Sequence, residues 1–128
     1  MAHRSRFAGF IIDCQTNDLD AAARFWSEAL GYPIKRHDDG EPDENFIRLD
    51  TRSDEITAEV QSVDHESRVH IDIETDDIEA EAERLEKLGA TRVAEIETWL
   101  VMEAPTGQRF CLVRPQNASF EAKAATWD

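Results

Sequence analysis

The feature that most constrains this chain is an internal repeat. Residues 17–21 read NDLDA, and residues 76–80, which lie 59 positions later, read DDIEA. Each copy follows a stretch with apolar residues at alternate positions and opens a helical pattern that ends at a glycine, Gly31 or Gly89, predicted as a left-handed C-cap. Self-similarity of this kind indicates one supersecondary unit used twice. We therefore expect a duplicated fold.

Each copy predicts one helix. The first helix begins at an N-cap of Asn17 or Asp18, and the second begins at Asp76, with Glu79 in the capping-box position. Apolar residues at helical spacing predict the buried stripes. These are Leu19, Ala22, Phe25, Trp26, Ala29 and Leu30 in the first helix, and Ile78, Ala82, Leu85 and Leu88 in the second.

The strands are predicted from alternation. Residues 69–74 (VHIDIE) alternate without exception between an apolar and an ionisable face, and residues 9–14 and 109–113 alternate in a similar way. Further strands are expected near residues 34–36, 46–50, 56–61, 91–96 and 99–104, with turns at 38–40 and 105–107. No regular structure is predicted for residues 117–128, although Phe120 and Trp127 can pack that end against the domain. The elements read strand, helix and three strands, twice, which predicts an α+β fold.

Composition limits the classes of partner. The 128 residues suit one domain, and the formal net charge of −14 argues against DNA, RNA or an anionic membrane as a partner. The apolar stretch after the basic start ends at Asp13, which is too short for a signal-peptide core or a membrane span. Two cysteines fit a reducing compartment. We expect one cytoplasmic domain over residues 1–128, with the acidic runs 38–44, 64–66 and 79–86 as solvated surface.

The order of these motifs resembles the glyoxalase/bleomycin resistance protein/dioxygenase superfamily, also called vicinal oxygen chelate proteins. The residues on which this resemblance rests are 18–19 (DL), 25–26 (FW) and 30–31 (LG) in the first half, and 69–72 (VHID), 76–78 (DDI), 88–90 (LGA) and 104–108 (APTGQ) in the second. The likeness covers about residues 7–116. It implies an α+β fold of two βαβββ modules forming a curled mixed sheet around a concave pocket, often in a homodimer. Module one would span about 7–62, module two about 68–114, and a C-terminal tail 115–128.

The resemblance also implies where a metal would bind. Metal-binding members use a His or Gln from the first strand of each module and a Glu from the last strand of a module. Here the first of these positions falls near Gly9, which has no side chain, and the closing Glu position falls on Cys111. His70 matches the second-module histidine, and Glu59 or Gln61 can add an oxygen ligand. No metal cofactor is favoured on this pattern; if a divalent metal binds, the expected ligands are His70 and Glu59.

Three functions follow from this reading. The leading one is a small-molecule binding protein that works without a catalytic metal. The second is a metal-dependent lyase, isomerase or dioxygenase of the same superfamily, and the third is an acidic dimeric interaction module with an occluded cup. The expected lining of the cup is Asp13, Arg48, Glu59, Gln61, His70, Asp72 and Cys111.

Simpler interpretations of the same residues stay open. His70 can be a sheet histidine hydrogen-bonded to Asp72, and Cys111 can be an inert buried thiol. Arg48 and Arg109 are candidate anchors for an anionic ligand, but each can equally form a surface salt bridge.

Overall fold

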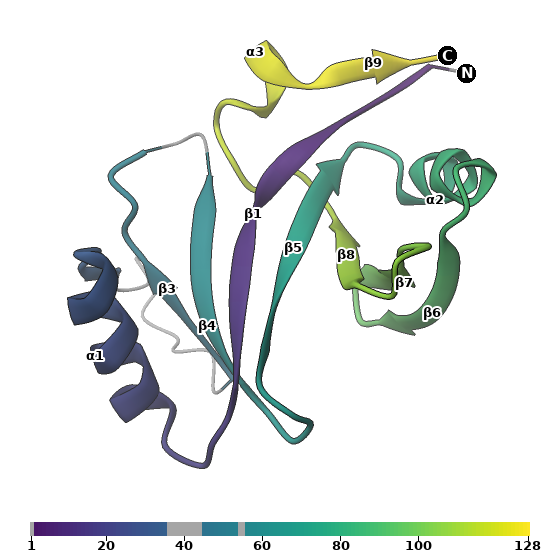
Figure 1. Cartoon of the computed structure of the whole chain (residues 1–128). Coiled ribbons are helices and arrows are strands. Elements are labelled where there is room, and N and C mark those ends of the chain that lie inside the picture. Colours follow the sequence, from purple (N-terminus) through teal and green to yellow (C-terminus); the bar gives the residue numbers. More distant parts are fainter. Residues whose placement is uncertain (1, 36–44, 54–55) are drawn as a thin grey trace. The chain divides into compact units, whose positions relative to one another are not determined.

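The structure is a computed structural model that describes residues 2–35, 45–53 and 56–128. Its first half runs β1 (His3–Gln15), α1 (Leu19–Leu30), β2 (Ile34–Lys35), β3 (Phe46–Leu49) and β4 (Thr57–Val63). The second half repeats this order with β5 (Arg68–Thr75), α2 (Ile78–Lys87), β6 (Thr91–Ile96), β7 (Trp99–Glu103) and β8 (Arg109–Val113), as Figure 1 shows. The predicted α+β fold with a mixed sheet is therefore confirmed. The predicted turn at 38–40, the acidic run 38–44 and the end of the strand at Arg36 lie outside the described residues.

The chain divides into two compact units. One unit comprises residues 10–69. Its strands β2, β3 and β4 pair antiparallel, with Ile34 opposite Leu49 and Leu49 opposite Ala58. Helix α1 packs on β3 and β4, so that Ala23 is buried together with Leu49, Ala58 and Val60. This small apolar layer is the core of the unit.

Helix α1 begins and ends as its sequence predicts, but its buried stripe is narrower. Asp18 is the N-cap and accepts a hydrogen bond from Ala21 N at 3.0 Å, and Gly31 has the left-handed φ of 75°. The side chains that pack inward lie at positions 19, 22, 23 and 26, one helical stripe facing two short strands. Phe25 is 62% exposed, and Ala29 and Leu30 are also exposed, so their predicted burial was wrong.

The other unit comprises residues 1–9 and 70–128. Strand β5 pairs parallel with β8, β8 pairs antiparallel with β7, and β7 pairs antiparallel with β6. Helix α2 packs on β6 and β8, and Ala82 is buried there against the apolar side chains of the sheet, which include Leu100, Met102, Phe110 and Leu112. One face of these strands is therefore covered by α2 (Figure 1).

The ends of α2 differ from the prediction by one residue. Asp77 is the N-cap and accepts from Ala80 N at 3.0 Å, because the Asp76 carboxylate instead accepts from Arg4 N at 2.9 Å. The C-cap is Leu88, and Gly89, with φ of 107°, takes the left-handed turn that follows it. Leu88 is 66% exposed because the helix has ended before it, so its predicted burial was wrong.

The C-terminal tail has more structure than its sequence predicts. It contains α3 (Phe120–Lys123) and β9 (Ala125–Trp127), and β9 pairs antiparallel with the start of β1, where Trp127 lies opposite His3. Phe120 is buried, and Trp127 Nε1 donates to Ser5 Oγ at 2.9 Å. The sequence of the tail does not predict β9, because its partner strand lies more than 100 residues away in the sequence.

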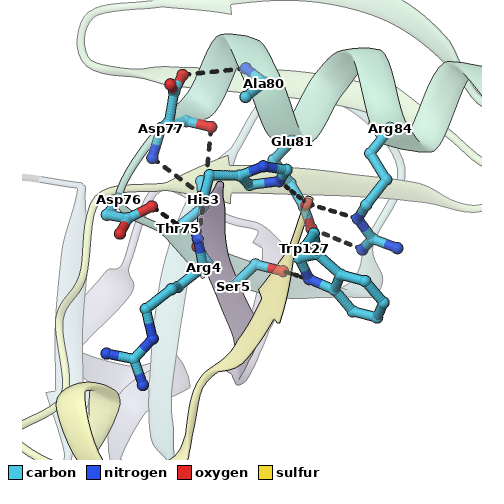
Figure 2. Close-up of polar contacts among 10 residues, drawn as sticks. All are labelled: His3, Arg4, Ser5, Thr75, Asp76, Asp77, Ala80, Glu81, Arg84 and Trp127. Carbon is cyan, nitrogen blue, oxygen red and sulfur yellow. Dashed lines mark hydrogen bonds and ion pairs between the residues drawn. The ribbon is translucent and has the colours of Figure 1, made fainter. Parts of the chain in front are cut away.

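A buried polar cluster joins this tail to α2, and Figure 2 shows it. Its centre is Glu81, which is 0% exposed, contrary to the solvated surface predicted for residues 79–86. Glu81 Oε1 lies 2.8 Å from His3 Nε2, and Arg84 donates to both carboxylate oxygens at 2.8 and 2.9 Å. The Arg84 guanidinium also stacks 3.8 Å from the centroid of the Trp127 ring. We call His3, Ser5, Glu81, Arg84 and Trp127 the Glu81 cluster.

The helices carry no membrane-spanning signal. Within the described ranges, none is long and apolar enough to cross a bilayer.

Candidate functional site

The β5–β8 pair carries a polar face. Phe110 and Leu112 of β8 point into the core under α2, so the residues between them and beside them in β8 face the other way. The same alternation along β5 places His70, Asp72 and Glu74 on one face. Asp72 lies opposite Cys111 in the β5–β8 pair, so the two polar rows lie side by side. A parallel pair thus brings chemistry-bearing side chains from distant parts of the sequence together.

Three of these side chains converge. One ligand atom each from His70, Asp72 and Cys111 lies within 4.8 Å of the other two. Asp72 and Cys111 are buried, and His70 is partly buried. We call these three residues the His70 cluster.

The Asp72 carboxylate is incompletely satisfied. Its Oδ1 atom is buried and accepts no hydrogen bond from the described residues, and His70 Nε2 lies 3.5 Å from it. A buried carboxylate oxygen without a hydrogen bond is costly, and such atoms are rare in folded proteins. A cation or a hydrogen-bond donor from a ligand would therefore be stabilised at this atom.

The residues of the His70 cluster fit a borderline divalent metal ion such as zinc, cobalt or nickel. An imidazole nitrogen, a carboxylate oxygen and a thiolate sulfur are all ligands of such ions, and three protein ligands leave a fourth position, and on expansion a fifth, for a bound molecule. Ligand atoms bound to one tetrahedral ion lie roughly 3.5 Å apart, so shifts of about an ångström would bring these three together. A bound ion of this kind supplies Lewis-acid stabilisation of negative charge on a ligand oxygen.

Glu74, the third ionisable residue on this face of β5, is already bound. Its Oε2 atom accepts hydrogen bonds from Gln116 N at 2.7 Å and from both Asn117 N and Asn117 Nδ2 at 3.2 Å. Arg6 Nε lies 3.8 Å from the other oxygen. Glu74 thus fixes the start of the C-terminal tail to β5.

The remaining residues predicted to line a cup belong to the unit of residues 10–69. Arg48 Nη2 donates to Glu59 Oε1 at 2.9 Å across the β3–β4 pair, in which Gln61 lies opposite Phe46. Asp13 is buried, with Arg68 Nε at 3.7 Å from its Oδ2. Glu59, the second predicted metal ligand, is therefore engaged by Arg48 within its own unit, and in the other unit His70, Asp72 and Cys111 form one cluster.

The Glu81 cluster is a second group of ionisable side chains in this unit, and the sequence did not predict it. Burial opposes the charge of Glu81, but hydrogen bonds from Arg84, His3 and Ser5 outweigh it and lower the pKa of the carboxyl group. Both Glu81 oxygens are bonded, so the cluster has the satisfied geometry of a structural element. The only local signal in the sequence is the spacing of Glu81 and Arg84, which suits a helical ion pair.

Solved structures of similar fold support the topology. The chain is similar to a hypothetical protein from Bacillus halodurans (10% identity, 88% of this chain and 96% of that chain covered, TM-score 0.63). It is also similar to methylmalonyl-CoA epimerase from Mycobacterium tuberculosis (15% identity, 91% of each chain covered, TM-score 0.58). A third is a glyoxalase/bleomycin resistance protein/dioxygenase superfamily member from Vibrio splendidus (20% identity, 84% of this chain and 97% of that chain covered, TM-score 0.53). At these identities the likeness shows the fold alone, which is the glyoxalase/bleomycin resistance fold.

Sequence comparison places the chain in a family. No curated protein matches its sequence. A family model described as the glyoxalase-like domain matches residues 9–113, a range that includes every member of the His70 cluster and leaves the C-terminal tail outside. The chain belongs to the glyoxalase-like domain family.

Proposed function

We propose that this protein binds a small, oxygen-bearing organic molecule on the polar face of β5 and β8, through a borderline divalent metal ion held by the His70 cluster. The observation that carries the proposal is the convergence of one nitrogen, one oxygen and one sulfur ligand atom within 4.8 Å. The Asp72 Oδ1 atom, buried and without a hydrogen bond from the described residues, supports it because a cation would satisfy that atom.

The donor set also favours some metals over others. Thiolate and imidazole bind zinc, cobalt and nickel well, whereas magnesium and calcium prefer oxygen ligands throughout. Cys111 stands where the family pattern implies a glutamate, so we expect a more thiophilic preference than an oxygen-rich site would have.

Metal-free binding of a small molecule is the second candidate. It is favoured by the 3.5 Å distance between His70 Nε2 and Asp72 Oδ1, which suits an ion pair when His70 is protonated. Such a pair offers a donor and an acceptor to a polar ligand without any ion. The two candidates differ in whether the purified protein retains metal.

Cobalt titration tests the proposal directly. Protein stripped with a chelator should bind one equivalent of Co²⁺ and develop a thiolate-to-cobalt charge-transfer absorption in the near ultraviolet. Elemental analysis after desalting should give the same stoichiometry. C111S should lose the charge-transfer absorption, and H70A should weaken cobalt binding at least tenfold, since each removes one of three ligands.

The chain offers a matched control, because it has one other cysteine. Cys14 lies in the unit of residues 10–69 and is a free thiol. C14S should leave both the absorption and the stoichiometry unchanged. A wild-type protein that retains no cobalt, zinc or nickel after loading would exclude the metal proposal and leave metal-free binding.

A further inference from the structure

Arg109 lies on the same face as the His70 cluster. It is the first residue of β8, two positions before Cys111, so the alternation of the strand gives both side chains the same face. Ile71 of β5 lies opposite Phe110 of β8, and continuing this parallel register by one residue places Arg109 beside His70. The two Cα positions on β8 are separated by about 6.6 Å, the repeat of an extended strand.

The guanidinium of Arg109 is only partly used. Its Nε atom donates to Glu103 Oε1 at 3.3 Å, and the side chain is 37% exposed. Its Nη1 and Nη2 groups donate to none of the residues that the structure describes. Arg92 differs, because its Nε, Nη1 and Nη2 all donate to Glu79 or Glu86. Arg109 therefore presents the pair of parallel donors that binds a carboxylate in a bidentate manner.

The proposed metal site would not attract an anionic ligand by its own charge. A divalent ion bound by one carboxylate and one thiolate, with a neutral imidazole, has no net formal charge. The whole chain carries −14, so it repels anions at long range. A negatively charged ligand would thus be attracted to this face by Arg109 rather than by the metal centre. Both side chains of the Arg109–Glu103 ion pair are more than a third exposed, so the pair contributes little free energy and opposes ligand binding only weakly.

We infer that the ligand of this site carries a carboxylate, which Arg109 binds through its Nη1 and Nη2 groups while oxygen atoms of the ligand occupy the open positions of the metal. The inference rests on the proposed function and deepens it by naming the class of ligand. Because Arg109 and Cys111 are only one strand repeat apart, we expect a short ligand, with about two carbon atoms between the carboxylate and the chelating oxygen.

Two hydroxamates that share a chelating group provide the probes. Acetohydroxamate is uncharged at its other end, and succinic acid monohydroxamate adds a carboxylate two carbons away. The dissociation constant of each is measured from the change in the visible spectrum of the cobalt-loaded protein. We expect the carboxylate-bearing probe to bind roughly tenfold more tightly than acetohydroxamate, as a charge-assisted bidentate contact does.

Four variants test whether Arg109 causes that preference. R109A should reduce the ratio of the two dissociation constants to about one. R109K keeps the charge without the paired donors and should give an intermediate ratio. E103Q should raise the ratio, because it removes the competing carboxylate. R92A removes one positive charge from the face of the sheet that packs on α2 and should leave the ratio as in the wild type.

The outcomes separate the two proposals. A wild-type protein that binds cobalt and acetohydroxamate but shows no preference for the carboxylate would overturn this inference alone, as would an R92A effect as large as that of R109A. A wild-type protein that binds no cobalt would overturn the proposed function, and the inference with it.

Discussion

Two buried carboxylates in the same compact unit have opposite surroundings. Glu81 accepts hydrogen bonds at both oxygens from Arg84, and His3 lies 2.8 Å from one of them. Asp72 has a histidine at 3.5 Å and a buried Oδ1 atom that accepts no hydrogen bond within the described part of the chain. A carboxylate that is fully bonded stabilises its fold, whereas an incompletely bonded one lowers stability unless something outside the chain binds to it. Glu81 therefore has the surroundings of a structural acid, whereas the Asp72 Oδ1 atom lacks a hydrogen bond and its carboxylate lies beside the nitrogen and sulfur donors of the His70 cluster.

Removing Glu81 should have the largest effect on stability. E81A leaves the charged Arg84 and the buried His3 without their shared partner, and we expect it to lower the free energy of unfolding by about 4 kcal/mol. Urea denaturation followed by circular dichroism would measure the change. D72A, measured in metal-free protein, should lower it by less than half as much. Equal losses for the two variants would contradict the comparison.

A part of the Glu81 contribution should disappear in acid. The hydrogen bonds lower the pKa of Glu81 below the ordinary carboxyl value of 4.5. Its contribution is therefore complete above the pKa of the unfolded chain and is lost as the pH falls through the lower pKa of the folded state. The difference in stability between the wild type and E81Q should shrink below about pH 4.5. A difference that is constant from pH 7 to pH 3 would show that the charge of Glu81 plays no part.

Replacing Trp127 should lower stability less than replacing Glu81, because Trp127 stacks on one side of the cluster and Glu81 lies at its centre. W127A removes the stacking on Arg84 and the hydrogen bond to Ser5 Oγ, and we expect a loss of about 2 kcal/mol. W127F keeps an aromatic ring over the guanidinium without the indole N–H, and should lose about half as much. Thermal melting of both variants checks this order; if the hydrogen bond were the main contribution, the two variants would lose the same stability, since both lack the indole N–H.

Replacing Asp72 by asparagine should have the smallest effect on stability, and it should raise the free energy of unfolding rather than lower it. In metal-free protein, D72N removes a buried charge that has no hydrogen bond at Oδ1, and we expect a gain of up to about 1 kcal/mol. The same variant should weaken cobalt binding at least tenfold, because an amide is a poor metal ligand. If D72N instead lowered the free energy of unfolding by several kcal/mol, Asp72 would be a structural residue like Glu81.

The parts of the fold that could be predicted are those with local causes. Alternation in residues 69–74 and the helix signals at Asp18 and Gly31 act over a few residues, so the sequence alone predicts them well. The shift of the second N-cap from Asp76 to Asp77 could not be predicted, because Asp76 is used by Arg4, 72 residues away. What limits the prediction is therefore how far away in the sequence the interacting partner lies.

The candidate sites show the same limit. His70, Asp72 and Cys111 were each predicted to face a common cup, since strand alternation fixes their faces. That these three form one cluster depends on the parallel register of β5 and β8, which the sequence does not reveal. Glu81 gave no sign of burial because it stands in an acidic run, and its partners His3 and Trp127 come from the two ends of the chain.

The parallel pairing of β5 and β8 has a kinetic consequence. Two strands that run parallel need a long connection, and here α2, β6 and β7 lie between Asp72 and Cys111, a loop of about 40 residues. The donors of the His70 cluster therefore meet only after most of this unit has assembled, and the unfolded chain offers a metal no equivalent site. A metal held there would leave the refolding rate nearly unchanged and would slow unfolding, so its stabilising effect would appear as a longer lifetime of the native state.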